Sequence, residues 1–367
     1  MIDHDELGAW LRLLESPGVG RESARRLLAA FGSPEAVFQA GHAAHVGAVG
    51  TVVAQALRVP LDGLPAQLEK TLQWLSLRPE THSVIGLGDP NYPALLLETA
   101  DPPLLLYAMG SLEHIRKPSL AVVGSRNPTQ QGLQNARAFA EHLSQSGLIV
   151  VSGLALGVDT AAHEGALAGP TGTIAVVGTG LDQVYPRRNA QLAQRIAENG
   201  LMLSEFSLGT PPLPANFPVR NRIIAGLTRG TLVVEAALQS GSLITARLAA
   251  EAGRDVYAIP GSIHSPQARG CNALIKQGAK LVDSAQDILE DQQLPSKVQT
   301  ASQSTRAENN EPDALLTALG YDPVSLEDLV GRTGWSAALL NTRLLELELD
   351  GQVARLPGQQ FQRLGRS

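Results

Sequence analysis

One short segment of the chain joins an aromatic ring to two guanidinium groups. Phe217 stands three positions before Arg220, and Asn221 separates Arg220 from Arg222. A ring that stacks on a base, beside arginines that bind phosphate, is what sequence-tolerant binding of a nucleic-acid strand requires. The apolar run 223–225 follows at once and predicts that the segment is anchored on a core element. The competing interpretation is a loop between two α/β units whose arginines are merely solvated.

Small-residue turns that follow apolar runs supply a second set of candidates. In an open α/β sheet the ligand lies at the carboxyl ends of the strands. Glycine and serine in such turns leave backbone amides free for an anion, and Arg126 would add a full charge. We therefore predict a phosphate-bearing ligand, although a tight turn is the simpler explanation for any single glycine. The turn residues are Gly124, Ser125 and Arg126, then Gly153, then the run 178–180, and finally Ser240, Gly241 and Ser242.

The familiar cofactor and metal motifs do not occur. The glycines at 178 and 180 have no third partner at the spacing that dinucleotide binding needs, and no phosphate-binding loop of the ATP type is present. No His or Cys pair has metal-ligand spacing, and the single Cys271 has no evident catalytic partners. Asp159 and His163 could form an acid/base pair, but helix capping and a buried hydrogen bond explain them better. We expect no cofactor, no metal and no catalytic residue.

The overall composition predicts a cytoplasmic protein of two or three domains. The chain has 367 residues, of which 44% are hydrophobic and 17% charged. The acidic N-terminus does not resemble a secretory signal, and no apolar run approaches the ~18 residues of a membrane helix. The net charge of −6 argues against nucleic acid, yet residues 211–280 hold eight basic and three acidic side chains. A basic face on an acidic protein is therefore expected.

The apolar patterns predict an α/β fold with flanking units. Short runs at 120–123, 148–151, 174–177, 201–203, 232–234 and 256–259 alternate with helical patterns, which indicates an extended Rossmann-like, doubly wound, mostly parallel sheet. Residues 1–78 are predicted to form a self-contained all-helical domain of the helix-hairpin-helix or SAM-like kind. Residues 79–291 form the Rossmann-like domain, 292–311 a polar linker, and 312–367 a winged helix.

The two flanking units each leave an alternative open. The break at 16–20 between two helices can hold a phosphate on its amides, or it is an ordinary helical turn. In the winged helix, Ser325 and Ser336 are expected to cap two helices. The second of these helices offers Arg343 but also Glu346 and Glu348, which is a poor match for a DNA groove. Docking of a protein fits that helix better.

With these segments in order, the chain closely resembles the DprA/Smf family of DNA-processing proteins. The resemblance covers about residues 82–282, with mild departures at Val158 and Thr228. It implies a single-stranded DNA-binding protein of natural transformation that protects incoming DNA and loads the RecA recombinase. The matching motifs are VVGSR at 122–126, SGLA at 152–155, GVD at 157–159, GTGLD at 178–182, FPVRNRIIAG at 217–226, SGSLITA at 240–246 and NALI at 272–275.

The family resemblance further implies a protein that is not an enzyme and that dimerises through its Rossmann-like domain. Binding is expected to be independent of sequence, with duplex DNA bound more weakly and no membrane involved. Carried onto this chain, the DNA site comprises Gly124, Ser125, Arg126, Gly153, Phe217, Arg220, Asn221, Arg222, Ser240, Gly241, Ser242 and Lys276.

Two other functions remain open at this stage. One is a nucleotide-processing enzyme of the lysine-decarboxylase-like phosphoribohydrolase kind, on a similar sheet, with Glu235 as the catalytic group. This chain lacks the Pro-Gly-Gly-x-Gly-Thr turn that precedes that glutamate. The other is a pure adaptor whose winged helix is the main binding surface.

Overall fold

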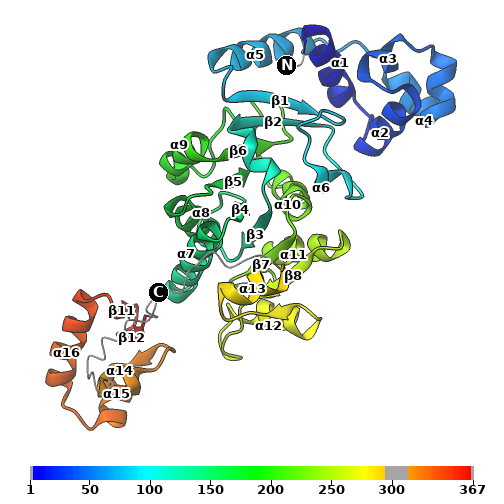
Figure 1. Ribbon diagram of the computed structural model, residues 1–367. Helices are drawn as coiled ribbons and strands as arrows, with labels where there is room; N and C mark the ends of the chain where they lie inside the picture. Colours follow the sequence, from blue (N-terminus) through cyan, green and yellow to red (C-terminus); the bar gives the residue numbers. More distant parts are fainter. Residues whose placement is uncertain (1–2, 294–312, 365–367) are drawn as a thin grey trace.

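The computed structural model describes residues 3–293 and 313–364 (Figure 1). Its centre is a nine-stranded sheet with the order β1-β2-β6-β5-β4-β3-β7-β8-β9. The strands are β1 (His82–Gly86), β2 (Leu105–Gly110), β3 (Ser119–Val123), β4 (Ile149–Ser152), β5 (Thr173–Val176), β6 (Leu201–Ser204), β7 (Gly230–Val233), β8 (Asp255–Ala258) and β9 (Lys280–Leu281).

The predicted mostly parallel, doubly wound sheet is confirmed. Strands β6, β5, β4, β3, β7, β8 and β9 run parallel, with Ala121 in register with Val151 on one side and Thr231 on the other. Strands β3 to β7 are buried along their whole length, as expected where helices cover both faces. Strands β1 and β2 add an antiparallel edge, which the sequence patterns did not predict.

Alternate residues of a strand face opposite sides of the sheet and pack in different apolar cores. Leu120 and Val122 of β3 pack with the helices α7, α8 and α13, whereas Ala121 and Val123 pack with α10 and α11. Figure 1 shows α7 and α8 on one side of the sheet and α10 and α11 on the other. The helices of this region are α6 (Ala94–Leu97), α7 (Gln130–Gln145), α8 (Val158–Ala168), α9 (Ala190–Asn199), α10 (Asn216–Gly226), α11 (Ser242–Glu251), α12 (Arg269–Lys276) and α13 (Ala285–Asp291), with 3₁₀ turns η1 (Leu112–Arg116) and η2 (Arg187–Asn189).

The N-terminal region is helical, as predicted, but it does not pack by itself. Ser33 accepts a hydrogen bond from the N–H of Ala36 and Pro34 opens the helix, which confirms the cap expected there. One apolar cluster runs from Trp10 and Trp74 onto Tyr107 of β2, so helices and sheet share a core. The helices are α1 (His4–Glu15), α2 (Arg21–Phe31), α3 (Pro34–Gln39), α4 (His42–Ala56) and α5 (Leu64–Leu77).

The C-terminal unit has the predicted winged-helix order and its own core. Ser325 and Ser336 cap their helices by accepting from the N–H groups of Asp328 and Leu339, and Gly334 ends the first helix in the left-handed region. A three-stranded sheet, in the order β10-β12-β11, completes the unit. Its elements are α14 (Ala314–Leu319), β10 (Val324–Ser325), α15 (Leu326–Thr333), α16 (Ala337–Leu349), β11 (Val353–Leu356) and β12 (Gln360–Arg363).

Two further findings concern the described chain as a whole. Within residues 3–293 and 313–364, no helix combines the length and the apolar character that crossing a bilayer would require. The polar linker predicted for 292–311 falls almost entirely on residues outside the described ranges.

An ion cluster ties the helical region to the sheet. Asp101, in the loop before β2, accepts hydrogen bonds from Arg21 and Arg25 of α2, and its carboxylate lies 3.0 Å from the Nε of Arg222 in α10. Arg222 also pairs with Glu205 at 2.5 Å. Burial opposes ionisation of Asp101, but the bond from Arg21 and the charge of Arg222 outweigh it and hold the pKa of Asp101 below its usual value.

We expect Asp101→Asn to lower the free energy of unfolding at pH 7 by about 1–2 kcal/mol, because a partly exposed carboxylate loses three cationic partners. Since the folded-state pKa is depressed, this stabilisation exists above the unfolded pKa of about 3.9 and disappears as the pH falls through the folded value. Urea unfolding of both proteins from pH 7 down to pH 3 measures it. A difference between the two proteins that stays constant over this range would contradict the assignment.

Candidate functional site

The order in which the chain adds strands to the sheet reverses between the neighbouring strands β3 and β7. From β3 the chain proceeds outward through β4, β5 and β6, then returns to place β7 on the other side of β3. Such a switch point opens a crevice outside the carboxyl ends of the two strands. A cleft of about 650 Å³ lies there, lined by residues that follow β3 and β7 and by helices α10 and α11.

The loop after β3 presents Arg126 to solvent. Ser125 is fixed from both sides, because its N–H donates to the carbonyl of Glu235 at 2.7 Å and its own carbonyl accepts from Val158 at 3.1 Å. Arg126 is therefore held at the rim while its side chain stays exposed. Its guanidinium carbon lies 5.6 Å from the centroid of the Phe217 ring. Among the described residues, no ion pair or side-chain hydrogen bond engages this guanidinium.

The segment 216–226 is a helix, α10, which the sequence analysis did not assign. Helical spacing places Phe217, Arg220 and Asn221 on one face, and all three line the cleft. Arg222 lies two positions from Arg220 and so points to the other side, where Asp101 and Glu205 neutralise it. The two arginines that appear as a pair in the sequence therefore have separate tasks.

Arg220 forms the floor of the cleft and is only 4% exposed. It donates to the carbonyl of Gly153 at 2.6 Å and to that of Val176. Burial lowers the pKa of Arg220 to about 10, with the charge of Asp159 opposing this and that of Arg126 adding to it. The side chain thus remains a cation at neutral pH, although its hydrogen bonds are directed at the protein.

Asp159 and His163 support the turn after β4. The buried hydrogen bond predicted for His163 is confirmed, whereas the helix cap predicted for Asp159 is wrong, because no side chain among the described residues caps α8 and Asp159 bonds to the preceding turn. Asp159 accepts from the N–H groups of Gly153 and Ala155, and burial raises its pKa against the opposing charge of Arg220. His163 accepts from the N–H of Leu154 at 3.3 Å. Burial lowers the pKa of His163 to about 3, so the ring is neutral and serves the structure.

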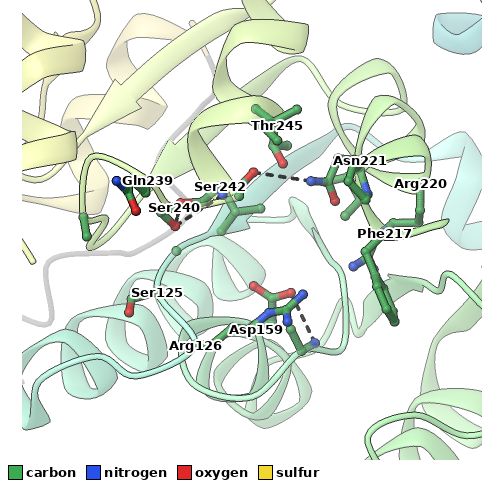
Figure 2. A pocket seen from close by; sticks show the side chains of 18 of the residues that line it. Ser125, Arg126, Asp159, Phe217, Arg220, Asn221, Gln239, Ser240, Ser242 and Thr245 are labelled. Carbon is green, nitrogen blue, oxygen red and sulfur yellow. Dashed lines mark hydrogen bonds between the residues drawn. The ribbon is translucent and has the colours of Figure 1, made fainter. Parts of the chain in front are cut away.

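The start of α11 forms the wall opposite α10. The hydroxyls of Ser240 and Ser242 lie 2.7 Å apart, and Asn221 donates to the carbonyl of Gly241 at 3.4 Å. The N-cap residue Gly241 provides no side-chain cap, although the Ser240 hydroxyl accepts from the N–H of Ser242 at 3.4 Å. Figure 2 shows Ser240 and Ser242 on one side, Asn221 and Phe217 on the other, and Arg126 and Asp159 between them. Hydroxyls and helix amides here suit an anion.

The structure brings nine of the twelve predicted site residues into one cleft and leaves three outside it. Gly153 lies beneath Arg220, Arg222 belongs to the ion cluster, and Lys276 is exposed at the end of α12. The nine that line the cleft are Gly124, Ser125, Arg126, Phe217, Arg220, Asn221, Ser240, Gly241 and Ser242.

The predicted site left out several residues that line the cleft, among them Asn127, Gln239 and Thr245, and one aromatic residue, Tyr185. The Tyr185 ring lies 5.5 Å from that of Phe217 at an angle of 34°, and the side chain is 44% exposed. An aromatic residue in the loop after the third apolar run, at a strand's carboxyl end, was the available signal. The cleft therefore offers two neighbouring rings.

Glu235 follows β7 but does not line the cleft. Its two carboxylate oxygens accept from the N–H of Thr129 at 2.9 Å and from the Thr129 hydroxyl at 2.6 Å, which anchors the start of α7. Glu235, the residue that the enzyme hypothesis makes catalytic, thus holds the start of α7 in this structure. Within residues 3–293 and 313–364, no group of three His, Cys, Asp or Glu side chains could hold a metal ion.

Two family models match this chain. The model of DNA recombination-mediator protein A covers residues 83–293, and that of the DprA winged helix domain covers residues 299–359. Protein Smf of Escherichia coli (strain K12) is 43% identical over 300 residues, which are 79% of this chain and 79% of that protein. DNA processing protein DprA of Streptococcus pneumoniae (strain ATCC BAA-255 / R6) is 51% identical over 201 residues, 55% of this chain and 71% of that protein.

Two solved structures are similar in fold. The X-ray structure of DNA processing protein A from Streptococcus pneumoniae has a TM-score of 0.66 at 39% identity and covers 76% of this chain and 95% of that one. A structure of DNA processing protein A from Helicobacter pylori, which concerns the single-stranded DNA binding mode of that protein, has a TM-score of 0.53 at 32% identity. It covers 58% of this chain and 95% of that one.

The tight contact below the cleft can be tested with two glycines. A Cβ at Gly153 would overlap the guanidinium of Arg220, whereas one at Gly241 would meet nothing within 4 Å. We expect Gly153→Ala to lower the free energy of unfolding by about 1–3 kcal/mol, as overpacking does. Gly241→Ala should change it by less than about 0.5 kcal/mol. Urea unfolding measures both, and equal stability of the two variants would contradict the packing described.

Proposed function

Because the chain belongs to the DNA recombination-mediator protein A family, DprA/Smf, we propose that its cleft binds single-stranded DNA. The observation that carries the proposal is the exposed Arg126 beside the half-buried Phe217, at the carboxyl ends of β3 and β7. Phe217 provides a face on which a base stacks, and Arg126 provides a charge that a phosphate neutralises. Tyr185 extends the aromatic surface.

This arrangement favours binding that does not depend on sequence. Ring faces, helix amides and a guanidinium engage base planes and phosphates, which every nucleotide offers. It also favours single strands over duplexes, since bases in a duplex are already stacked and a flat ring gains little from them. Duplex DNA should therefore bind more weakly.

We infer binding rather than catalysis at this cleft. Asp159 is the one carboxylate among its lining residues, and that group already accepts from two backbone N–H groups. We also propose that the protein is cytoplasmic, that it protects an incoming DNA strand and that it loads RecA onto this strand. That part of the proposal rests on family membership and on the description of the family as a recombination mediator.

A homodimer through the Rossmann-like domain is proposed on a different surface. Strand β9 forms one edge of the sheet, and its residue Leu281 is 48% exposed. A groove of about 810 Å³ between α11 and α12 reaches Ala279 beside this edge, with Leu238 also exposed at its rim. An unpaired edge strand beside an apolar groove is suited to pairing with a second copy.

Removing either the exposed cation or the aromatic ring at the rim should weaken DNA binding without unfolding the protein. We expect Arg126→Ala and Phe217→Ala each to weaken binding of a fluorescein-labelled ~30-residue homopolymer by about 10-fold or more, because one phosphate contact or one base stack is lost. Fluorescence anisotropy measures this. Arg229→Ala is the matched control, since Arg229 is likewise exposed but lies at the amino end of β7.

The salt dependence gives a second readout of the same contact. Each neutralised phosphate contributes about 0.7 to the slope of log K against log salt for single strands, so Arg126→Ala should reduce the slope by about that amount. Equal affinities of wild type and Arg126→Ala would remove the cleft from the proposal. Release of adenine from AMP by the wild type would instead indicate the nucleotide-processing enzyme.

Breaking the proposed dimer should impair RecA loading. We expect Leu281→Glu to shift the protein from dimer to monomer in sedimentation velocity, because two carboxylates would meet across the edge. Loading is measured as the lag before RecA hydrolyses ATP on single-stranded DNA covered by a single-strand-binding protein, and the variant should lengthen that lag. A wild-type monomer would exclude the dimer, and an unchanged lag would separate dimerisation from loading.

A further inference from the structure

The winged-helix unit carries a charge that does not suit DNA. Its described residues, 313–364, contain four arginines, no lysine and seven acidic side chains. Proteins that grip DNA do so mainly by neutralising phosphates with basic groups, and an acidic surface repels the backbone. The charge of this unit is therefore the first indication that its partner is something else.

Three of the four arginines of the unit are held by ion pairs or hydrogen bonds, and the fourth, Arg355, is exposed. Arg343 of α16 pairs with Asp313 at 2.9 Å and with Glu346 at 2.6 Å. Arg332 donates to a backbone carbonyl at 3.0 Å. Arg355 and Arg363, on the strands of the wing, lie over the rings of Phe361 and Tyr321 at 5.8 and 5.0 Å. Among the described residues of the unit, α16 thus offers no unpaired guanidinium, and the wing offers only that of Arg355.

Helix α16 is apolar on two opposite faces. Leu340, Leu344 and Leu347 are buried in the core of the unit. At 3.6 residues per turn the opposite side carries Ala338, Thr342, Leu345 and Leu349, which are all exposed. Leu345 is 56% and Leu349 81% exposed. We call these four residues the outer stripe of α16.

Two acidic residues flank the outer stripe. On the same helical projection Glu346 lies on one side of it and Glu348 on the other, and both are exposed. An apolar line with a carboxylate on each side matches an amphipathic helix that carries an apolar line between positive charges. Arg343 pairs with Glu346 at 2.6 Å and also with Asp313 at 2.9 Å, so these three side chains together keep a negative charge.

We propose that the outer stripe of α16 is a docking surface for a helix of another protein, with an apolar stripe flanked by lysine and arginine. Among the possible occupants, duplex DNA is disfavoured by the acidic flanks and because only one arginine of the described unit, Arg355, is left unpaired. A second copy of this chain is disfavoured as well. A twofold contact through the stripe would set Glu346 and Glu348 against their own counterparts. This inference is independent of the DNA site in the cleft.

The test selects ligands without assuming one. A displayed library of random 16-residue peptides is panned against the full-length protein, and the peptides retained are titrated by fluorescence anisotropy. We expect retained peptides to share leucines at positions i, i+3 or i+4 and i+7, with lysine or arginine beside them. The double variant Leu345→Glu/Leu349→Glu should weaken their binding at least 10-fold. Glu346→Lys/Glu348→Lys should weaken it several-fold, and more at low salt.

Leu77→Glu is the matched control, because Leu77 is a comparably exposed leucine, 74%, at the end of α5, and it should leave peptide binding unchanged. The substituted leucines are exposed, so the variants should fold, and circular dichroism checks this. The proposal is overturned if no peptide is retained, or if retained peptides lack basic residues. It is also overturned if the peptides bind the double variant equally, if α16 variants abolish binding of a duplex instead, or if they abolish self-association.

Discussion

A guanidinium that is taken out of water must find acceptors within the protein, and one nitrogen of Arg220 finds them in two backbone carbonyls, whereas its Nε has no partner among the described residues. Its contacts to the carbonyls of Gly153 and Val176 join α10 to the ends of β4 and β5. The turn that carries Gly153 needs its own support, and Asp159 and neutral His163 supply it through backbone N–H groups. An unpaired buried charge would cost far more than these bonds cost to arrange. The floor of the cleft is therefore a buried arginine held by the backbone of two strand ends.

The residues at the rim of the cleft are held by fewer contacts than those of its floor. Arg126 is exposed and Phe217 is half-buried, and within the described structure no ion pair engages Arg126. A long cationic side chain and a flat ring can follow a flexible strand, provided that the elements carrying them do not move. Ser125 prevents such movement, since it bonds to the carbonyl of Glu235 and to the first residue of α8. The residues that support the cleft thus differ from those proposed to contact the ligand.

The cleft and the winged-helix unit differ in the sign of their charge. The formal net charge is −6, yet the cleft is lined by two arginines and one aspartate, and its serines and helix amides add partial positive charge. The winged-helix unit is acidic, and three of its four described arginines are held by ion pairs or backbone carbonyls. Like-signed surfaces of phosphate and carboxylate repel one another, so the two units suit ligands of opposite charge. A single total charge for the chain conceals this division.

The order of the buried runs along the chain, the capping serines and the glycine and serine turns could be predicted from the sequence. Those features depend on local periodicity and turn chemistry, which neighbouring residues express directly. The sequence also placed Arg126 after a parallel strand, where a ligand cleft is expected. The separation of Arg220 from Arg222 could not be predicted from it. Once the segment becomes a helix, residues two apart point in opposite directions, and Asp101 from a distant loop claims one of them. The contact between the Tyr185 and Phe217 rings, and the core that the N-terminal helices share with the sheet, have the same cause. Long-range packing brings together residues that no local pattern relates.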